Sequence, residues 1–201
     1  EPEQYVKLEE MEIGNEVFGV VIDVTEDVLK RRQIEAERDV DLLTGLYNRR
    51  GMEAQITLLF RKKERMGYAA LVMIDADGLK GINDNYGHEE GDRIISAAAN
   101  ILMKKTKKNY VVRYGGDEFI VMGTVNSEKE VRDYWTAVEA EVEKYNQKND
   151  KKAQLSFSYG YDVFKMSAST YLEECIKVTD EKMYQNKKQK KLARAEQLKE
   201  N

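Results

Sequence analysis

The sequence has one cysteine and one histidine among its 201 residues. Cys175 therefore has no partner for an intramolecular disulfide, and His88 alone cannot build a zinc site of the His/Cys type. A bound metal would have to be held by oxygen ligands. No apolar run reaches the roughly 18 to 20 residues that cross a bilayer, and no signal-peptide pattern opens the chain. We expect a soluble, cytoplasmic fragment without membrane contact, and membrane attachment of its parent protein stays open.

A large charge of one sign is also missing. The chain carries 33 basic and 37 acidic residues, a formal net charge of -4. A surface of mixed sign does not favour binding to DNA or RNA. The hydrophobic content of 41% suffices for one core of ordinary size and part of a second. Because the sequence begins Glu1-Pro2-Glu3 without an initiator methionine, we expect a piece of a longer protein.

The apolar patterns predict an α+β fold. Strand patterns occupy residues 68–74, 110–114, 119–122 and 155–161, and patterns of helical period lie before, between and after them. The resulting order is helix, strand, helix, hairpin, helix, strand, helix. It contains the βαββαβ arrangement of a ferredoxin-like palm, an antiparallel sheet flanked by helices. The continuous apolar run of residues 68–74 indicates a strand covered on both faces.

Two acidic pairs follow predicted strands. Asp75 and Asp77 come after the buried strand, and Asp117 and Glu118 follow Gly115-Gly116, where we expect a tight turn with positive φ. If the two strands are neighbours, both pairs project toward one point, and such close like charges call for a cation. Magnesium, which prefers carboxylate, water and phosphate oxygens, is the natural choice, and a nucleoside triphosphate would complete its shell.

The segment between the two acidic pairs has the composition of a phosphate-binding loop. Its glycines, at positions 78, 81, 87 and 91, would let backbone amides approach a phosphate chain. Lys80 is placed to meet the phosphates. Asn83 and Asp92 offer the acceptors that a guanine edge needs, which favours GTP over ATP. Taken singly, each pattern also has an ordinary explanation as a turn or a solvated charge; the combination is what favours a site.

Four motifs in order carry a family resemblance. The sequence reads D-L-L-T-G-L-Y-N-R-R at 41–50, D-A-D-G-L-K-G-I-N-D at 75–84, Y-G-H with G-D between 86 and 92, and R-Y-G-G-D-E-F at 113–119. Together they cover about three quarters of the chain and resemble the GGDEF diguanylate cyclases, magnesium-dependent enzymes that condense two GTP molecules into cyclic di-GMP. The resemblance implies a nucleotide-cyclase palm that acts as a homodimer, with Mg²⁺ as its cofactor and Mn²⁺ as a substitute.

The resemblance also implies a role for each matched position. Asp75, the main-chain carbonyl of Ala76 and Asp117 would be metal ligands, and Asp117 and Glu118 would accept the proton of the attacking ribose hydroxyl. Substrate binding would fall to six residues: Asn83 and Asp92 at guanine, His88 beside the substrate, and Lys80, Lys187 and Lys191 at the phosphates. The last helix resembles the family ending A-D-x-A-L-Y-x-A-K-x-x-G-R, except that Lys190 and Lys191 replace Gly-Arg. Lysine lacks the planar fork of arginine, so weaker substrate binding is expected.

Other departures and the flanking segments complete the sequence-based expectations. The family's product-inhibition motif R-x-x-D is replaced at Thr106 and Asn109, which predicts no inhibition by cyclic di-GMP through that site. Residues 1–27, which contain a predicted strand at 16–24 and a D-V-T-E junction, resemble the end of a PAS-like sensor domain. Residues 28–40 form a helical linker that either pairs with its own copy or is solvated. The cyclase domain spans 41–192, and 193–201 is a charged tail.

Two functions remain open at this point. The first is an active diguanylate cyclase. The second is a catalytically silent GGDEF domain that binds GTP, or nothing, and serves as a regulatory or dimerising module. A phosphodiesterase of the same signalling system is set aside, because the sequence has no E-A-L motif.

Overall fold

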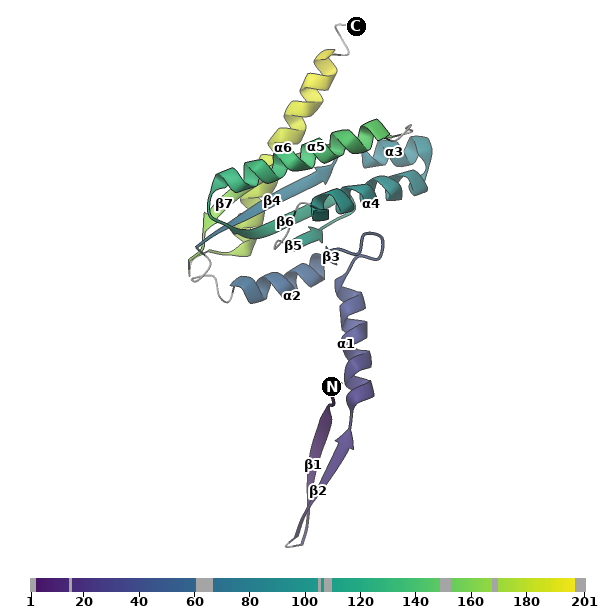
Figure 1. Ribbon diagram of the computed structural model, residues 1–201, viewed down its shortest axis with the longest axis vertical. Coiled ribbons are helices and arrows are strands. Elements are labelled where there is room, and N and C mark those ends of the chain that lie inside the picture. Colours follow the sequence, from purple (N-terminus) through teal and green to yellow (C-terminus); the bar gives the residue numbers. More distant parts are fainter. Residues whose placement is uncertain are drawn as a thin grey trace. The chain divides into compact units, whose positions relative to one another are not determined.

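The computed structural model describes residues 3–14, 16–60, 67–104, 106, 110–148, 153–167 and 170–197, apart from the side chains of 13, 33, 35–37, 56–60, 194 and 197. It divides into two compact units, Glu1–Asp39 and Val40–Asn201. Figure 1 labels the elements, which in chain order are β1 Val6–Ile13, β2 Glu16–Asp23, α1 Thr25–Asp39, β3 Tyr47–Asn48, α2 Arg49–Phe60, β4 Tyr68–Ala76, α3 Leu79–Tyr86, α4 His88–Lys104, β5 Tyr110–Arg113, β6 Glu118–Val125, α5 Glu128–Lys148, β7 Phe157–Lys165 and α6 Leu172–Gln197.

The first unit is an antiparallel hairpin followed by one helix. Strands β1 and β2 pair from Val6 opposite Asp23 to Ile13 opposite Glu16, and their described side chains are exposed. The backbone of Tyr5 is bonded to Val24 and to the hydroxyl of Thr25, which fixes the start of α1 beside the open end of the hairpin. Strand β2 and the helix follow the sequence-based prediction. Strand β1 was not predicted, because two consecutive glutamates, Glu9 and Glu10, break its alternation of apolar and polar residues.

The second unit is built on a five-stranded sheet in the order β3-β5-β6-β4-β7. The pairs β4–β6, β4–β7 and β5–β6 are antiparallel, and the two-residue strand β3 joins β5 in parallel. The four longer strands have the order and connections of the predicted βαββαβ palm. Strand β4 lies between β6 and β7 and is buried after its first residue, as its apolar run predicted.

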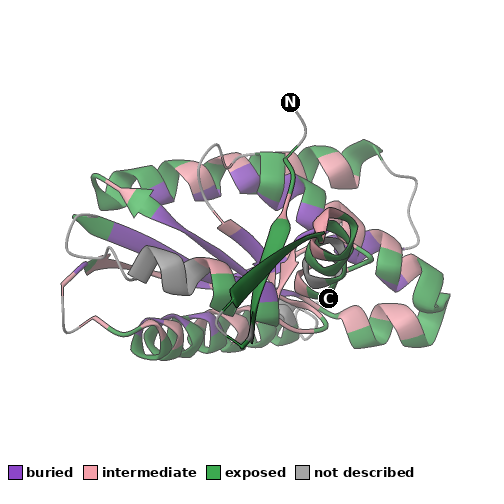
Figure 2. Ribbon diagram, turned by 90° about the horizontal axis from the view of Figure 1, so that it is seen from below, coloured by how far each residue is buried: buried purple, intermediate pink, exposed green. Residues whose placement is uncertain are grey.

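Helices cover both faces of this sheet. Alternate residues of β4, such as Val72 and Ile74, pack with α4 and α5 through Ile94 and Trp135. The intervening residues of β4 pack on the opposite face with Met52 of α2 and with Cys175 and Met183 of α6. Figure 2 shows the buried positions gathered on the strands and on the inner sides of the helices. Among the described helices, none combines the length and the apolar content needed to cross a bilayer.

Two local expectations were wrong. The predicted phosphate-binding loop is mostly helical, because α3 occupies Leu79–Tyr86 and α4 begins at His88. The glycines with positive φ in this segment are Gly78 and Gly87, which flank α3, whereas Gly115 and Gly116 do not adopt positive φ. Helix α6 continues to Gln197 through much of the expected charged tail.

Candidate active site

Strand register places two carboxylates side by side. Asp75 near the end of β4 lies opposite Glu118 on β6 and opposite Ser158 on β7. Directly opposite residues point to the same face of a sheet. Since alternate residues of β4 and β6 pack on α6, Asp75 and Glu118 share the face that α6 covers. The predicted meeting of the two acidic segments is therefore a consequence of β4 and β6 being neighbours.

The turn between β5 and β6 is shaped around Glu118. The amide N–H of Tyr114 and that of Gly115 both donate to the Glu118 carbonyl, at 2.8 and 3.2 Å. A Cβ on Gly115 would lie 2.7 Å from Glu118 Oε2, so glycine here leaves room for that side chain in its present position and does not supply positive φ. The Ala76 N–H donates to the Asp117 carbonyl at 2.8 Å, which joins the end of β4 to this turn.

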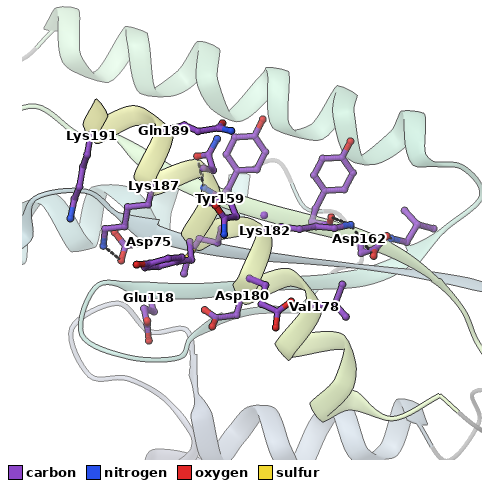
Figure 3. A pocket seen from close by; sticks show the side chains of 18 of the residues that line it. Asp75, Glu118, Tyr159, Asp162, Val178, Asp180, Lys182, Lys187, Gln189 and Lys191 are labelled. Atoms are coloured by element: carbon purple, nitrogen blue, oxygen red, sulfur yellow. Dashed lines mark hydrogen bonds and ion pairs between the residues drawn. The ribbon is translucent and has the colours of Figure 1, made fainter. Parts of the chain in front are cut away.

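Lys187 of α6 supplies a cation to the carboxylates. Its Nζ donates to Asp75 Oδ2 at 2.5 Å, and the Asp75 side chain is only 6% exposed. Figure 3 shows this pair, with Glu118 on the neighbouring strand. Burial lowers the pKa of Lys187, but the hydrogen bond to Asp75 and the charges of the nearby carboxylates outweigh burial, so the pKa is raised. Lys187 is thus held as the ammonium ion.

The pKa values of the two carboxyl groups, Asp75 and Glu118, are also raised, which favours their neutral forms. Burial raises the pKa of Asp75, Lys187 opposes that rise, and the charges of Asp117 and Asp77 add to it. Burial also raises the pKa of Glu118, with further contributions from the charges of Asp117, Asp180 and Asp75. One lysine does not balance this group of carboxylates, and a further cation would be favoured there.

Two buried oxygens lack a hydrogen-bond partner among the described side chains. They are Asp75 Oδ1 and Asn83 Oδ1. An unmade hydrogen bond at a buried acceptor is costly and calls for an explanation such as a ligand. Both residues belong to the site derived from the sequence, Asp75 as a metal ligand and Asn83 as a guanine acceptor.

Asn83 is set in place by a glycine of the neighbouring helix. A Cβ on Gly91 of α4 would lie 1.9 Å from Asn83 Oδ1, so only glycine leaves room for this side chain. Asp92 follows Gly91 and is exposed, as are Lys80 on α3 and His88 at the start of α4. These four predicted substrate residues are therefore carried by the α3–α4 pair, which begins directly after the Asp75 turn.

Asp77 differs from the expectation that it would join Asp75. Its two carboxylate oxygens accept hydrogen bonds from Ser156 Oγ at 2.7 Å and from Ser158 Oγ at 2.6 Å. Its N–H donates to the Ser156 carbonyl at 2.9 Å. Asp77 is therefore engaged by β7 and by the segment just before it, and it does not present a free carboxylate beside Asp75.

Arg113 connects the turn to the first motif. Its Nη1 donates to both carboxylate oxygens of Asp41, at 3.1 and 3.0 Å, and its Nε and Nη2 donate to the Gly116 carbonyl. Asp41 in turn accepts from the backbone and the hydroxyl of Thr44. The opening motif and the G-G-D-E-F turn are thus held by one guanidinium.

The two positions of the family's product-inhibition motif are Thr106 and Asn109. The Thr106 side chain is half-buried, and Asn109 lies outside the described residues.

A groove of about 1380 Å³ opens from the carboxylates along β7 and α6. Its lining includes Asp75, Glu118, Lys187 and Lys191, so both predicted lysines of the last helix face the same space as the carboxylates (Figure 3). Asp180 also lines it and was missed by sequence reasoning. The pairing of Asp180 with this site could not be read from spacing, because α6 reaches the sheet only through tertiary packing.

Within the described part of the chain, no three His, Cys, Asp or Glu side chains are grouped closely enough to hold a metal by themselves. The residues present nevertheless fit a partly hydrated magnesium ion. Asp75 offers an unpartnered buried oxygen, and Asp117 lies at the adjoining strand end. Mg²⁺ usually takes one or two protein carboxylates and completes its octahedron with water and phosphate oxygens.

Known proteins are similar to this chain in sequence and in fold. The family described as "Diguanylate cyclase, GGDEF domain" matches residues 38–192. Relatives include the probable diguanylate cyclase DgcJ of Escherichia coli (31% identity over 79% of this chain and 31% of the relative) and the diguanylate cyclase VdcA of Vibrio cholerae (29% over 87% and 52%). The chain thus spans between about a third and a half of these curated relatives.

Solved structures agree on the fold. The coiled coil and GGDEF domain of DgcB from Caulobacter crescentus, solved in complex with c-di-GMP, superimposes with a TM-score of 0.72 at 22% identity, covering 82% of this chain and 90% of that one. The diguanylate cyclase SiaD of Pseudomonas aeruginosa, solved with its activator SiaC, gives a TM-score of 0.68 at 21% identity, covering 82% and 65%. With the family match extending over most of the sequence, this chain belongs to the GGDEF diguanylate cyclase family.

Proposed function

We propose that this chain condenses two GTP molecules into cyclic di-GMP and two pyrophosphates. The observation that carries the proposal is the pair of buried, unpartnered oxygens on Asp75 and Asn83. One lies where a metal ligand is expected and the other where a guanine acceptor is expected. Unsatisfied buried acceptors are uncommon in folded proteins, and a metal ion at Asp75 and a guanine donor at Asn83 would satisfy both.

Substrate binding is divided between two regions of the domain. Asn83 and Asp92 on the α3–α4 pair accept hydrogen bonds from the guanine ring N–H and amine, and His88 lies beside the substrate. Lys80, Lys187 and Lys191 contact the triphosphate. Asp75, the Ala76 carbonyl and Asp117 would hold Mg²⁺, for which Mn²⁺ could substitute. The metal, when bound, neutralises charge that develops on the phosphates and orients the reacting oxygens.

The reaction is a nucleotidyl transfer performed twice. The 3′-oxygen of one GTP forms a bond to the α-phosphorus of the other, the bond from that phosphorus to the pyrophosphate oxygen breaks, and the 3′-hydroxyl proton passes to a carboxylate. Glu118, with Asp117 beside it, is the proposed acceptor. Burial and the neighbouring carboxylates raise its pKa, which makes the ionised form a stronger base than an exposed glutamate.

One domain holds one GTP, so ring closure requires two domains facing each other as a homodimer. The first unit is the part that we propose to control this encounter. Its D-V-T-E junction at residues 23–26 and its exposed hairpin fit the end of a PAS-like sensor domain, and α1 fits a signalling helix. An upstream sensor in the longer protein would then regulate how two cyclase domains meet.

The alternative is a catalytically silent GGDEF domain that acts as a GTP-binding or dimerising regulatory module. Two observations favour it. Lys187 is paired directly with Asp75, so nucleotide binding must compete with this pair, and Lys190 and Lys191 stand where the family has Gly-Arg. The intact Asp117 and Glu118 favour the active enzyme.

Incubation with GTP and Mg²⁺ followed by chromatography of the nucleotides distinguishes the two. An active cyclase yields cyclic di-GMP, Asp117→Ala abolishes it, and Asp133→Ala on the distant surface of α5 leaves it unchanged. Because the isolated chain could lack a dimer contact, the assay is repeated with a dimeric coiled coil fused upstream. GTP binding without product in both formats would establish a silent GTP-binding module, and absence of both product and GTP binding would leave only a silent dimerising module.

A further inference from the structure

Asp77 is a buried carboxylate that the proposed chemistry does not use. Its side chain is only 9% exposed, and each of its oxygens already accepts a hydrogen bond from a serine hydroxyl. A metal could take Asp77 as a ligand only by displacing Ser156 or Ser158. Its arrangement resembles a structural anchor more than an open ligand.

The anchor holds the turn that carries the metal ligands. Asp77 follows Asp75 and Ala76 directly, and its N–H is bonded to the Ser156 carbonyl. The Ala76 N–H is bonded in the opposite direction, to the Asp117 carbonyl. The turn after β4 is therefore fixed to the β7 side through Asp77 and to the β6 side through Ala76.

Lys190 extends the anchor to α6. Its ammonium donates to the Phe157 carbonyl at the start of β7 and lies 3.9 Å from Asp77 Oδ2. Lys190 is three residues beyond Lys187 on the same helix, which places both side chains on one face of α6. The helix thus contacts the turn twice, with Lys187 at Asp75 and Lys190 near Asp77.

We propose that Asp77 and Lys190 are positioning residues, which, with Ser156 and Ser158, hold the Asp75–Ala76 turn in the geometry that binds the metal. Asp77 is not itself a ligand. This inference rests on the proposed function of the same site. It assigns a role to Lys190, which occupies a glycine position of the family ending.

The test measures metal binding and not only turnover. Mn²⁺ is titrated into the protein in the presence of a GTP analogue with a methylene group between its α- and β-phosphorus atoms, and free Mn²⁺ is followed by electron paramagnetic resonance. The variants are Ser156→Ala/Ser158→Ala, Lys190→Met and Lys190→Arg. Lys188→Met is the matched control, because Lys188 is an exposed lysine of the same helix.

The serine double variant distinguishes a positioning role of Asp77 from a ligand role by the direction in which Mn²⁺ affinity changes. If Asp77 positions the turn, loss of its donors loosens Asp75 and weakens Mn²⁺ binding, by roughly fivefold for the loss of about one hydrogen bond. If Asp77 is a ligand restrained by the serines, freeing it leaves Mn²⁺ binding equal or tighter, and the proposal is overturned. Lys190→Met should weaken binding to a similar degree, while Lys190→Arg and Lys188→Met should match the wild type.

Thermal melts of the same proteins exclude general unfolding as the cause. Weakened Mn²⁺ binding in folded variants supports the anchor, and Lys190→Met with wild-type binding overturns the part assigned to Lys190. A wild-type protein that binds neither Mn²⁺ nor the analogue would instead overturn the proposed function and this inference together. The behaviour of the wild type therefore tells the two failures apart.

Discussion

Lys187 on α6 donates to Asp75 on β4 across 112 positions of sequence, and no closer cation meets that carboxylate in the described structure. The pair joins the helix that should hold phosphates to the strand that should hold the metal. Since Asp75 Oδ1 has no partner, the carboxylate retains one free oxygen while Lys187 occupies the other. The charges of a bound metal ion and of the triphosphate would therefore have to be balanced together with the charge of Lys187.

Lys187→Met should weaken GTP binding while the domain stays folded. The variant loses a charged contact to the phosphates, which should raise the KM for GTP at least roughly tenfold. The measurement is initial rate against GTP concentration at saturating Mg²⁺. Lys188→Met, which removes an exposed lysine one position away, should keep the wild-type KM. An unchanged KM in Lys187→Met would remove this residue from the substrate site.

Activity should fall as pH is lowered through the raised pKa of the carboxylate cluster. The pKa of Glu118 lies above its usual 4.5 because of burial and neighbouring charges, and the proton acceptor must be ionised. The acid limb of kcat/KM should therefore lie above the range of an exposed glutamate. Glu118→Gln should lower the rate by roughly 10² to 10⁴ and remove or displace that limb.

The stability of the metal-free protein should respond to pH with the opposite sign. Asp75 and Glu118 bind protons more tightly when folded than when unfolded, so their contribution is fully present below 3.8 and 4.5 and is lost as pH rises through the raised folded pKa values. Melts with and without Glu118→Gln across this window measure it. A wild-type acid limb at the ordinary glutamate pKa would contradict both expectations.

The Asp41–Arg113 ion pair should stabilise the domain above acid pH. Burial raises the pKa of Asp41, but hydrogen bonds from Thr44 and Arg113 outweigh burial, so its pKa is lowered below 3.8. Its contribution is therefore present above pH 3.8 and is lost as pH falls through the folded pKa. Arg113→Met should cost about 1 to 3 kcal/mol at neutral pH, and the difference should shrink in acid.

Chemical denaturation at several pH values tests this pair. The control is Arg132→Met, which removes an exposed ion pair with Glu128 and should change stability by no more than about 0.5 kcal/mol. A loss in Arg113→Met that is the same at pH 7 and pH 3 would show that packing, and not the charge of Asp41, carries the effect.

Local patterns in the sequence were enough to predict the palm, because each of its main strands and helices has its own pattern of apolar residues. The apolar run of β4 and the order of elements follow from side-chain periodicity, and Asp75 could be placed at a strand end from the run alone. Helix α3 was missed because its glycine and polar residues match a loop, although Gly78 and Gly87, with φ of 77° and 87°, mark its two ends.

Sequence patterns could not predict the contacts that tertiary packing makes. The hydrogen bonds from Ser156 and Ser158 to Asp77 depend on β7 lying beside β4, and the S-x-S-x-G pattern at 156–160 gives no sign of a partner about 80 residues away. Likewise, Gly115 was expected to supply positive φ but instead leaves room for the Glu118 carboxylate. Spacing identifies which residues are near a strand end, and the fold decides which partners they meet there.

Gly91→Ala should displace Asn83 and weaken guanine binding. Within a helix this change normally stabilises by about 0.5 to 1 kcal/mol. Here the new Cβ would lie 1.9 Å from Asn83 Oδ1, so the end of that side chain must move and the gain in stability should be smaller than usual. Gly81→Ala in α3, where nothing lies within 4 Å, is the stability control and should gain. Calorimetry with GTP should show at least roughly tenfold weaker binding for Gly91→Ala.

A second substitution tests whether the clash is with the Asn83 side chain. Truncation of that side chain in Gly91→Ala/Asn83→Ala removes the atom that the new methyl group would strike. The double variant should recover stability relative to Gly91→Ala while guanine binding stays weak. If stability is not recovered, the cause lies in the backbone of α3 and not in Asn83.

Gly160→Ala should separate α6 from the sheet, and no side-chain truncation should restore it. The added Cβ would lie 2.2 Å from the Met183 backbone nitrogen and 2.4 Å from the Thr179 carbonyl oxygen, so the helix itself must move. We expect a loss of about 3 kcal/mol or more in denaturation, at the upper end of overpacking costs. Because α6 carries Lys187, GTP binding should weaken in the fraction that folds. Met183→Ala added to Gly160→Ala should give no recovery, in contrast to the Gly91 pair, since the obstacle is backbone. Recovery of stability by that second change would show that α6 approaches β7 less closely than these distances require.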